Sequence, residues 1–376
     1  MFYIAFIITL LYVILILSLI LGCNTVSDFK LKNVKPKVKF SIIIPFRNES
    51  KNLPELLKTI GELKYPKVNF EVILVNDASE DNSVTVISEF IKTASQKLNI
   101  TIIDNIRVSK SPKKDAITTA ILKAKHEWII TTDADCILPH LWLHTFNECI
   151  IQNTCNFIVA PVTFANSNTT FERFQILDIL SLQGATIGAF GLNKPFLCNG
   201  ANLAYNKTFF NTLNGFEGNN NIASGDDVFM LEKAVKFSPE SVTYLKHKDA
   251  IVQTHPEANF KQLISQRVRW AAKASKYDNW FSKITGVTVF MMNLLTSVLW
   301  FLLAFKQLHL TTFSIFFTIK IGVDFILIHK TARFFNQKKH LTSYLISGVF
   351  YPFFSVFVVF ISFFKDYNWK GRQFSK

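Results

Sequence analysis

The first feature of this chain is an uninterrupted apolar run followed by a cluster of lysines. Positions 2–22 carry no charge, and at 1.5 Å per residue a helix of that length crosses about 30 Å of hydrocarbon. The lysines that follow are Lys30, Lys32, Lys35, Lys37 and Lys39, with Asp28 as the one counter-charge. Because positive charge favours the cytoplasmic side of a membrane, the pattern predicts an N-terminal anchor and a cytoplasmic domain after it.

Further apolar runs near the other end predict two to three more membrane spans. Positions 284–305 and 341–364 are uncharged and long enough to cross. Between them, 311–328 is apolar except for Lys320 and Asp324, whose i,i+4 spacing allows them to pair on one helix face. If all three runs cross, however, the short basic tail lies outside, against the positive-inside rule. One run is then re-entrant or lies along the interface, and the sequence leaves open which.

The middle of the chain, 38–282, alternates short β-branched runs with amphipathic helical patterns. The predicted strands are 40–45, 70–75, 100–103, 128–132 and 157–160. Leu53, Leu56, Leu57, Ile60 and Leu63 recur at helical spacing, with Ser50 as a possible cap. This alternation predicts an α/β domain with a mostly parallel sheet, between an anchor at 1–25 and a membrane region at 283–376.

Composition and charge narrow the class of protein. Hydrophobic residues make up 49% of the chain and charged residues 18%, which excludes a disordered protein. The net charge of +14 is compatible with nucleic acid, an anionic membrane or a phosphorylated ligand, and the apolar ends favour the last two over nucleic acid. The five cysteines form no CxxC pair, so neither a disulfide framework nor a structural metal site is indicated.

Polar side chains follow the first two predicted strands. Pro45, Arg47 and Glu49 come at the end of the first strand, and Asp77 and Ser79 follow the second. In an open α/β sheet, ligands bind at the carboxyl ends of the strands. Neither strand leads into a GxGxxG or P-loop pattern, which argues against those nucleotide sites. Taken alone, Asp77 and Ser79 are equally compatible with a helix cap.

A third strand delivers two carboxylates, Asp133 and Asp135, at i,i+2 spacing. Extended backbone points such a pair to one face, where a cation is needed to offset the repulsion. Mg²⁺ and Mn²⁺ bind one or two carboxylates together with substrate phosphates, so the pair indicates a metal–diphosphate site. A lone DxD is also common as a turn or cap.

Two later motifs supply further candidate groups. Asp226 and Asp227 precede an apolar helical pattern, where they are either helix caps or, if one carboxylate reaches a hydroxyl, a general base. The stretch QRVRW at 266–270 then provides Arg267, Arg269 and Trp270 just before the membrane region. Arg269 is a candidate diphosphate clamp and Trp270 a sugar or acceptor platform, whereas Arg267 fits a lipid-interface role nearly as well.

Seven short motifs in order resemble the series found in membrane-bound family-2 glycosyltransferases. They are IIIPFRNE at 42–49, VNDAS at 75–79, KKDAI at 113–117, DAD at 133–135, CNGAN at 198–202, GDD at 225–227 and QRVRW at 266–270. The resemblance implies a GT-A fold that binds a nucleotide-diphosphate sugar and inverts the anomeric centre. Departures are Asn76 and Ala78 in the second motif, Pro112 before Lys113, and Gly225-Asp226 before the base.

The resemblance also implies a role for each site residue. Asp227 corresponds to the catalytic base and Asp135 to the ligand of Mg²⁺ or Mn²⁺. The nucleotide-sugar residues are Pro45, Arg47, Glu49, Asp77, Lys113 and Asp133. The residues at the diphosphate and acceptor are Asn199, Gly200, Asp226, Gln266, Arg269 and Trp270.

The sequence therefore predicts a cytoplasm-facing membrane glycosyltransferase that uses a UDP-sugar and a lipid-linked or polysaccharide acceptor. A small processive synthase and a polyprenyl-phosphate glycosyltransferase remain alternatives. A transporter or nucleotide-binding scaffold is less compatible, because the apolar runs carry too few polar residues for a midplane site. A glycoside hydrolase needs carboxylates about 5 to 9.5 Å apart on either side of a sugar, which Asp133 and Asp135 match poorly.

Overall fold

We examined a computed structural model of the chain, which describes residues 2–94, 98–165, 169–220, 222, 224–274, 276–364, 367–369 and 372–374. The centre of the molecule is a seven-stranded sheet in the order β3-β2-β1-β4-β7-β5-β8. Its strands are β1 (Phe40–Phe46), β2 (Phe70–Asn76), β3 (Ile100–Asp104), β4 (Trp128–Thr131), β5 (Phe157–Val159), β7 (Leu203–Asn206) and β8 (Val242–Tyr244). All five predicted strands are present, within one residue at each end.

The sheet is mostly parallel, as predicted, with one antiparallel strand. β1 pairs in parallel with β2 and β4, β2 with β3, and β5 with β8. β7 runs antiparallel to both of its neighbours, β4 and β5. Two small sheets accompany the main one, formed by the pair β6 (Val162–Phe164) and β9 (Val252–Thr254) and by the pair β10 (Tyr367–Trp369) and β11 (Arg372–Phe374). The sequence analysis missed β6 to β11, because strands of three or four residues are too short to show alternation.

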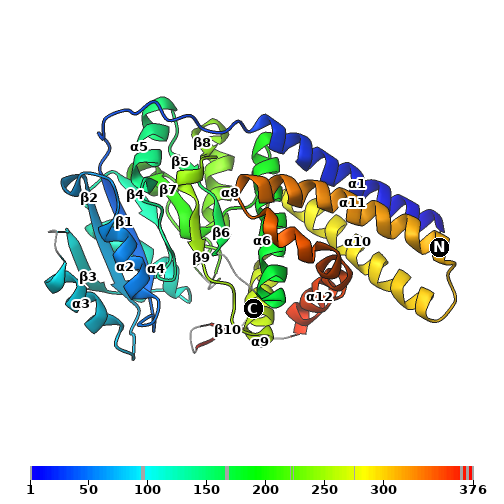
Figure 1. Ribbon diagram of the computed structural model, residues 1–376. Helices are drawn as coiled ribbons and strands as arrows, with labels where there is room; N and C mark the ends of the chain where they lie inside the picture. The colour runs from blue at the N-terminus through cyan, green and yellow to red at the C-terminus, as the bar shows by residue number, and fades with distance from the viewer. Residues whose placement is uncertain are drawn as a thin grey trace.

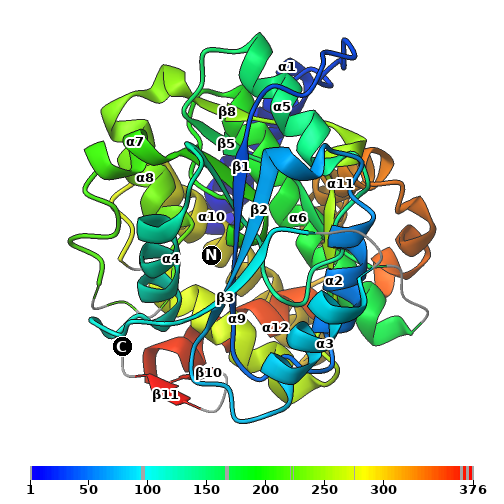
Figure 2. The ribbon, with the colours of Figure 1, turned by 90° about the vertical axis from the view of Figure 1, so that its left-hand side faces the viewer.

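Helices cover both faces of the sheet (Figures 1 and 2). The helices of the domain are α2 (Leu53–Gly61), α3 (Ser83–Thr93), α4 (Pro112–Lys123), α5 (Trp142–Gln152), α6 (Thr170–Gly191), α7 (Lys207–Thr212), α8 (Val228–Phe237) and α9 (Phe260–Ala274). Short 3₁₀ helices span Lys67–Asn69, Gly200–Asn202, Pro239–Ser241, Lys248–Ala250 and Lys338–Ser343. The apolar residues of α4 pack on one sheet face, and those of α2 and α5 pack on the other.

The sequence predicted a helix cap at Ser50 and an ion pair between Lys320 and Asp324, and only the ion pair is present. Ser50 does not cap α2: the helix begins at Leu53, and Asn52 stands at the N-cap position without a side-chain cap bond. Ser50 instead donates its backbone N–H to Asp81, which ties it to the loop after β2. The predicted pair of Lys320 and Asp324 is present, with Nζ and Oδ2 2.7 Å apart.

Among the described residues, four helices are long and apolar enough to cross a membrane, one N-terminal and three C-terminal. They are α1 (Phe2–Thr25), α10 (Trp280–Ala304), α11 (Leu310–Phe334) and α12 (Tyr344–Phe364), the last extended by the preceding 3₁₀ turn. α1 packs closely on α6 through glycines: a Cβ atom on Gly22 would lie 2.1 Å from the carbonyl oxygen of Gly188. Backbones can approach this closely only where side chains are absent.

Candidate active site

A large cavity opens at the carboxyl ends of β1, β2 and β4, and its volume is about 770 Å³. The walls also include α4, α6, the start of α8 and one face of α9. All fourteen site residues predicted from the sequence line this cavity: Pro45, Arg47, Glu49, Asp77, Lys113, Asp133, Asp135, Asn199, Gly200, Asp226, Asp227, Gln266, Arg269 and Trp270. Residues separated by more than 220 positions in the chain thus face one space.

At the β1–β2 end of the cavity, Arg47 and Asp77 are joined through the backbone. Arg47 Nη1 donates to the carbonyl oxygen of Asp77 at 2.9 Å, and the Asp77 carboxylate accepts from Asn105 at 2.7 Å. Asp77 does not cap the next helix, because α3 begins at Ser83 with Asn82 at its N-cap position. Ala78 has a φ of +55°, a left-handed conformation that a Cβ atom disfavours, so a glycine would fit this position better.

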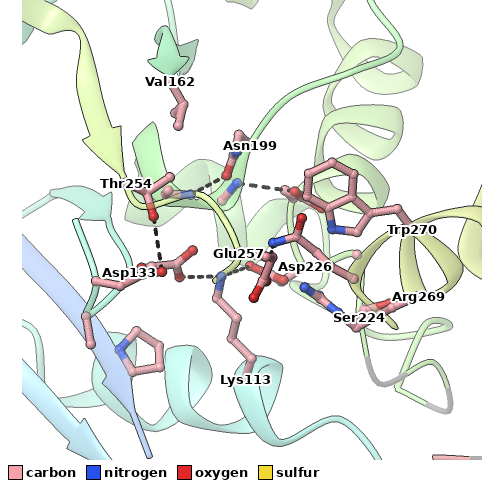
Figure 3. A pocket seen from close by; sticks show the side chains of 18 of the residues that line it. Lys113, Asp133, Val162, Asn199, Ser224, Asp226, Thr254, Glu257, Arg269 and Trp270 are labelled. Carbon is pink, nitrogen blue, oxygen red and sulfur yellow. Dashed lines mark hydrogen bonds and ion pairs between the residues drawn. The ribbon is translucent and has the colours of Figure 1, made fainter. Parts of the chain in front are cut away.

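The middle of the cavity holds a lysine between carboxylates (Figure 3). Lys113 Nζ lies 2.6 Å from Asp133 Oδ1 and 3.3 Å from Asp226 Oδ2. Burial by itself lowers the pKa of Lys113, but the two carboxylates outweigh it and hold the pKa well above its usual value. Lys113 is therefore a permanent cation here, with its charge directed at the acidic groups.

Asp135 is the residue best placed to hold a divalent cation. Its Oδ2 accepts a hydrogen bond from Thr254 Oγ1 at 3.1 Å, which orients the carboxylate, and in the described part of the chain Lys113 pairs with Asp133 and not with Asp135. The described residues include no group of three or more His, Cys, Asp or Glu side chains arranged to hold a metal ion. A single carboxylate suits Mg²⁺ or Mn²⁺, which complete their oxygen shell with water and substrate phosphates.

Asp227 caps α8, as one of the two interpretations of the sequence predicts, and it also lines the cavity. Oδ1 accepts from the backbone N–H of Val228 at 2.8 Å, and Oδ2 accepts from that of Gly200 at 3.2 Å. Burial raises the pKa of Asp227, but Lys273, 3.5 Å from Oδ1, and Lys113 outweigh it and lower the pKa. Asp227 is thus held ionised.

The pKa of Asp226 is shifted in the opposite direction, upward. Burial is the largest influence and raises its pKa, and the neighbouring Asp227 and Asp133 carboxylates raise it further, against the pull of Lys113. The two adjacent acids are therefore pushed apart in pKa by their surroundings, which is a common arrangement at catalytic sites.

One face of α9 forms the wall opposite the strands. Gln266, Arg269, Trp270 and Lys273 recur at i, i+3, i+4 and i+7 and all line the cavity. Gln266 Nε2 donates to Glu257 Oε1 at 2.6 Å. Lys273 was not among the site residues predicted from the sequence, although the i+7 spacing from Gln266 places it on the same helix face.

Arg267 points away from this face into the protein. Its Nε lies 2.7 Å from Asp178 Oδ2 on α6, and its guanidinium lies 4.2 Å from the centre of the Trp270 ring. Both members of the ion pair are buried. The lipid-interface role for Arg267 is therefore wrong, because the side chain joins α9 to α6.

Arg267→Met is expected to lower the free energy of unfolding by about 3 kcal/mol, because it leaves the buried Asp178 carboxylate without its cation. Thermal unfolding of the detergent-purified protein measures this loss. The double variant Asp178→Asn/Arg267→Met, which removes both charges, should recover most of it. A single variant as stable as wild type would contradict a structural role for the pair.

Lys114 is a second residue that the sequence analysis missed. It is 1% exposed, and its Nζ donates to the carbonyl oxygens of Asn219 at 2.7 Å and Ile222 at 3.0 Å. These carbonyls belong to the loop that leads into Asp226 and Asp227, so Lys114 positions the acids from behind. Burial lowers the pKa of Lys114 to about 8. In the sequence Lys114 directly follows Lys113, and its position does not distinguish it from a lysine on the exposed surface of a helix.

This shift predicts a pH dependence of stability. Between pH 8 and 10.5 the folded protein loses the Lys114 proton before the unfolded chain does, so the unfolded state binds more protons and stability rises with pH. The free energy of unfolding of wild type minus that of Lys114→Met should therefore increase across this window, by at most about 1.4 kcal/mol per pH unit. Urea unfolding at several pH values measures the difference, and a constant difference would contradict the shift.

Comparison with known proteins places these residues among sugar-transferring enzymes. Residues 41–213 match the model for glycosyl transferase family 2, and residues 128–363 match that for glycosyl transferase family group 2. Glycosyltransferase AglE of Haloferax volcanii is 24% identical over 231 residues, which cover 61% of this chain and 70% of AglE. The poly-β-1,6-N-acetyl-D-glucosamine synthase of Staphylococcus epidermidis is 20% identical over 274 residues, or 69% of this chain and 62% of the synthase.

A solved structure has a similar fold. The mannosyltransferase PcManGT from Pyrobaculum calidifontis, determined with GDP-Man and Mn²⁺, aligns with a TM-score of 0.58 and 17% sequence identity. The alignment covers 92% of this chain and 98% of PcManGT. At this level of identity the similarity supports the GT-A fold.

Proposed function

Because this chain belongs to the family 2 glycosyl transferases, we propose that its cavity transfers a sugar from a nucleotide-diphosphate sugar, a UDP-sugar, with inversion at the anomeric carbon. The observation that carries the proposal is the arrangement of charges across one cavity. The strand-end acid Asp133 pairs with Lys113 of α4, Asp227 at the start of α8 pairs with Lys273 of α9, and Asp135 lines the same cavity.

The donor occupies the strand side of the cavity in this proposal. Arg47 and Asp77 bind the nucleoside, with Pro45 and Glu49 beside them, and Asp133 and Lys113 contact the nucleotide sugar. Asp135 holds Mg²⁺ or Mn²⁺, which when bound offsets the charge of the diphosphate. Arg269 contacts the same diphosphate from α9. Negative charge grows on the diphosphate as the sugar–phosphate bond breaks, so Arg269 stabilises the transition state more than the ground state.

Asp227 acts on the acceptor side. An acceptor hydroxyl has a high pKa and needs a base as it attacks, and Asp227 is ionised and faces the cavity. Trp270 provides a flat ring for the acceptor, and Asn199 and Gly200 shape the wall beside it. The acceptor oxygen then forms a bond to the anomeric carbon on the face opposite the departing diphosphate, while its proton passes to Asp227, and this displacement inverts the anomeric centre.

The acceptor that we propose is lipid-linked or a polysaccharide, reached from the cytoplasmic side of the membrane. Four apolar helices identify a membrane protein, and the lysines after α1 support the cytoplasmic side for the domain. The similarity to a poly-N-acetylglucosamine synthase makes a small processive synthase the alternative. Chloroform-extractable labelled lipid would favour the first acceptor, and water-soluble labelled polymer would favour the second.

The test is a panel of nucleotide-sugars incubated with purified protein and membrane lipid, with and without EDTA. We expect release of the nucleoside diphosphate from one donor, dependent on Mg²⁺ or Mn²⁺ and accompanied by labelled product. Nucleotide release that is insensitive to the identity of the sugar, or unaffected by EDTA, would contradict the proposal.

A further inference from the structure

α12 has the length and composition of a membrane span, yet its contacts differ from those of the other three apolar helices. α1, α10 and α11 run side by side away from the sheet, towards the end marked N in Figure 1. α12 packs on α9 and also on α10, where Ser355 accepts a hydrogen bond from Asn293 at 3.3 Å and the Phe353 ring lies 6.0 Å from that of Phe301. Contacts at both ends of α12 indicate on which side of the membrane each end lies.

The helices α1, α10 and α11 form a bundle with one end at the domain and one end far from it. At the far end, the ring of Phe2 lies 5.9 Å from that of Phe316, and Trp300 lies 4.6 Å from Phe313. At the near end, Lys330 of α11 donates a hydrogen bond to Asn24 of α1. α11 therefore starts at the far end and returns to the side of the sheet.

The start of α12 is held on the catalytic side. Gln337, in the connection from α11, donates from Nε2 to the carbonyl oxygen of Phe164 at 2.7 Å and accepts from Thr163 Oγ1 at 2.9 Å. Both partners belong to β6, and Phe164 also lines the catalytic cavity.

The second half of α12 is held on the same side. The Phe354 ring lies 5.3 Å from that of Phe174, in the first turns of α6, and Val358 packs with Leu263 and Val268 of α9. Beyond the helix, Arg372 forms an ion pair with Asp77 at the end of β2. The helix is about 30 Å long, so if it crossed the bilayer these last contacts would have to form on the other side of the membrane.

The outward face of α12 is apolar along its whole length. Its exposed residues are Leu345, Ile346, Phe350, Phe357, Phe360, Phe363 and Phe364. Ile346, Phe350, Phe357, Phe360 and Phe364 follow one another at helical spacing and form one stripe, and the buried Phe354 and Val358 lie to one side of it. A helix packed on a domain in water would place polar residues there.

From these contacts we propose that α12 enters the lipid beside α10 and returns to the catalytic side without crossing, so that the chain crosses the bilayer three times, and that its phenylalanine stripe is a lipid-docking surface. The exposed Arg333, Lys338 and Lys339 directly before the helix suit anionic headgroups. The basic tail then shares the side of the lysines after α1, which removes the conflict with the positive-inside rule.

The docking surface has a consequence for the cavity. α9 packs directly on α12 and carries Gln266, Arg269 and Trp270 on its cavity face. An α12 anchored in the lipid on the catalytic side would therefore hold the acceptor wall of the cavity at a set height above the membrane.

Topology mapping tests the proposal without any assumption about the reaction. Epitope tags are inserted singly after Lys376, between α10 and α11 at position 307, and in the exposed β2–α3 loop at position 80, and each is probed with antibody on sealed vesicles of both orientations. We expect the tags at 376 and 80 to be accessible in the same vesicles and the tag at 307 in the opposite ones. A tag at 376 that is accessible together with the tag at 307 would overturn the proposal.

Accessibility measurements provide a second test that does not depend on the tail. Leu345→Cys and Phe363→Cys, near the two ends of α12, each carry a nitroxide and should both be reduced by ascorbate added on the side where the tag at position 80 is exposed. Met291→Cys, in the exposed part of α10, is the matched control and should be protected from ascorbate on both sides. Reduction of the two α12 labels from opposite sides would indicate a crossing helix and contradict the proposal.

Discussion

Asp227→Asn is expected to lower the turnover number about a thousandfold, within the range that a general base contributes, with little change in stability. The amide cannot accept the acceptor proton, whereas asparagine is as good an N-cap as aspartate. The bond to the backbone N–H of Val228, which begins α8, can therefore persist in the variant. Steady-state release of nucleoside diphosphate measures turnover, and thermal unfolding in the same detergent checks that the fold is retained.

Asp226→Asn is the matched control for this prediction, because the two acids are adjacent and lie on the same cavity. A raised pKa makes Asp226 the stronger proton acceptor in principle, but Lys113 lies 3.3 Å from its carboxylate and Asp133 shares that lysine. We therefore expect a much smaller loss from Asp226→Asn. If the control loses activity a thousandfold and Asp227→Asn does not, the base is Asp226 and the assignment is wrong.

The site was largely predictable because its residues are fixed by local patterns. Asp77 and Asp133 directly follow buried strands, and the carboxyl ends of parallel strands meet at one edge of a sheet whatever the details of the loops. The cavity face of α9 follows in the same way from helical spacing. The pattern of apolar positions thus determined which polar groups share a space.

What the sequence did not reveal depends on contacts between distant segments. Lys114 differs from Lys113 only in its orientation on α4, and the carbonyls that it contacts come from a loop more than 100 positions later. Arg267 and Asp178 are likewise paired only because α6 and α9 cross. The 341–364 run is equally apolar whether it spans the bilayer or returns to the side from which it enters, so composition cannot distinguish the two, and the contacts of Phe354 with α6 and of Val358 with α9 depend on the folded chain.

The second large effect is expected at Asp135. Asp135→Ala should raise the activation barrier by several kcal/mol and thereby lower turnover on the order of a thousandfold. The reason is that it removes the carboxylate proposed to hold the divalent cation against the leaving diphosphate. Lys113 cannot substitute for the lost site, since its charge is already committed to Asp133 and Asp226. Activity measured after EDTA treatment and titration with Mg²⁺ or Mn²⁺ should recover in wild type and remain low in the variant.

Thr254→Val provides the control that separates metal binding from general damage to the site. It removes the hydroxyl that orients Asp135 at 3.1 Å but keeps the carboxylate, so we expect a weaker apparent metal affinity with turnover near that of wild type at saturating metal. A site that uses Lys113 in place of a metal would behave differently: EDTA would leave wild-type turnover unchanged, and Asp135→Ala would cost no more than Thr254→Val. Such a result would assign charge neutralisation to the lysine and exclude Asp135 as a metal ligand.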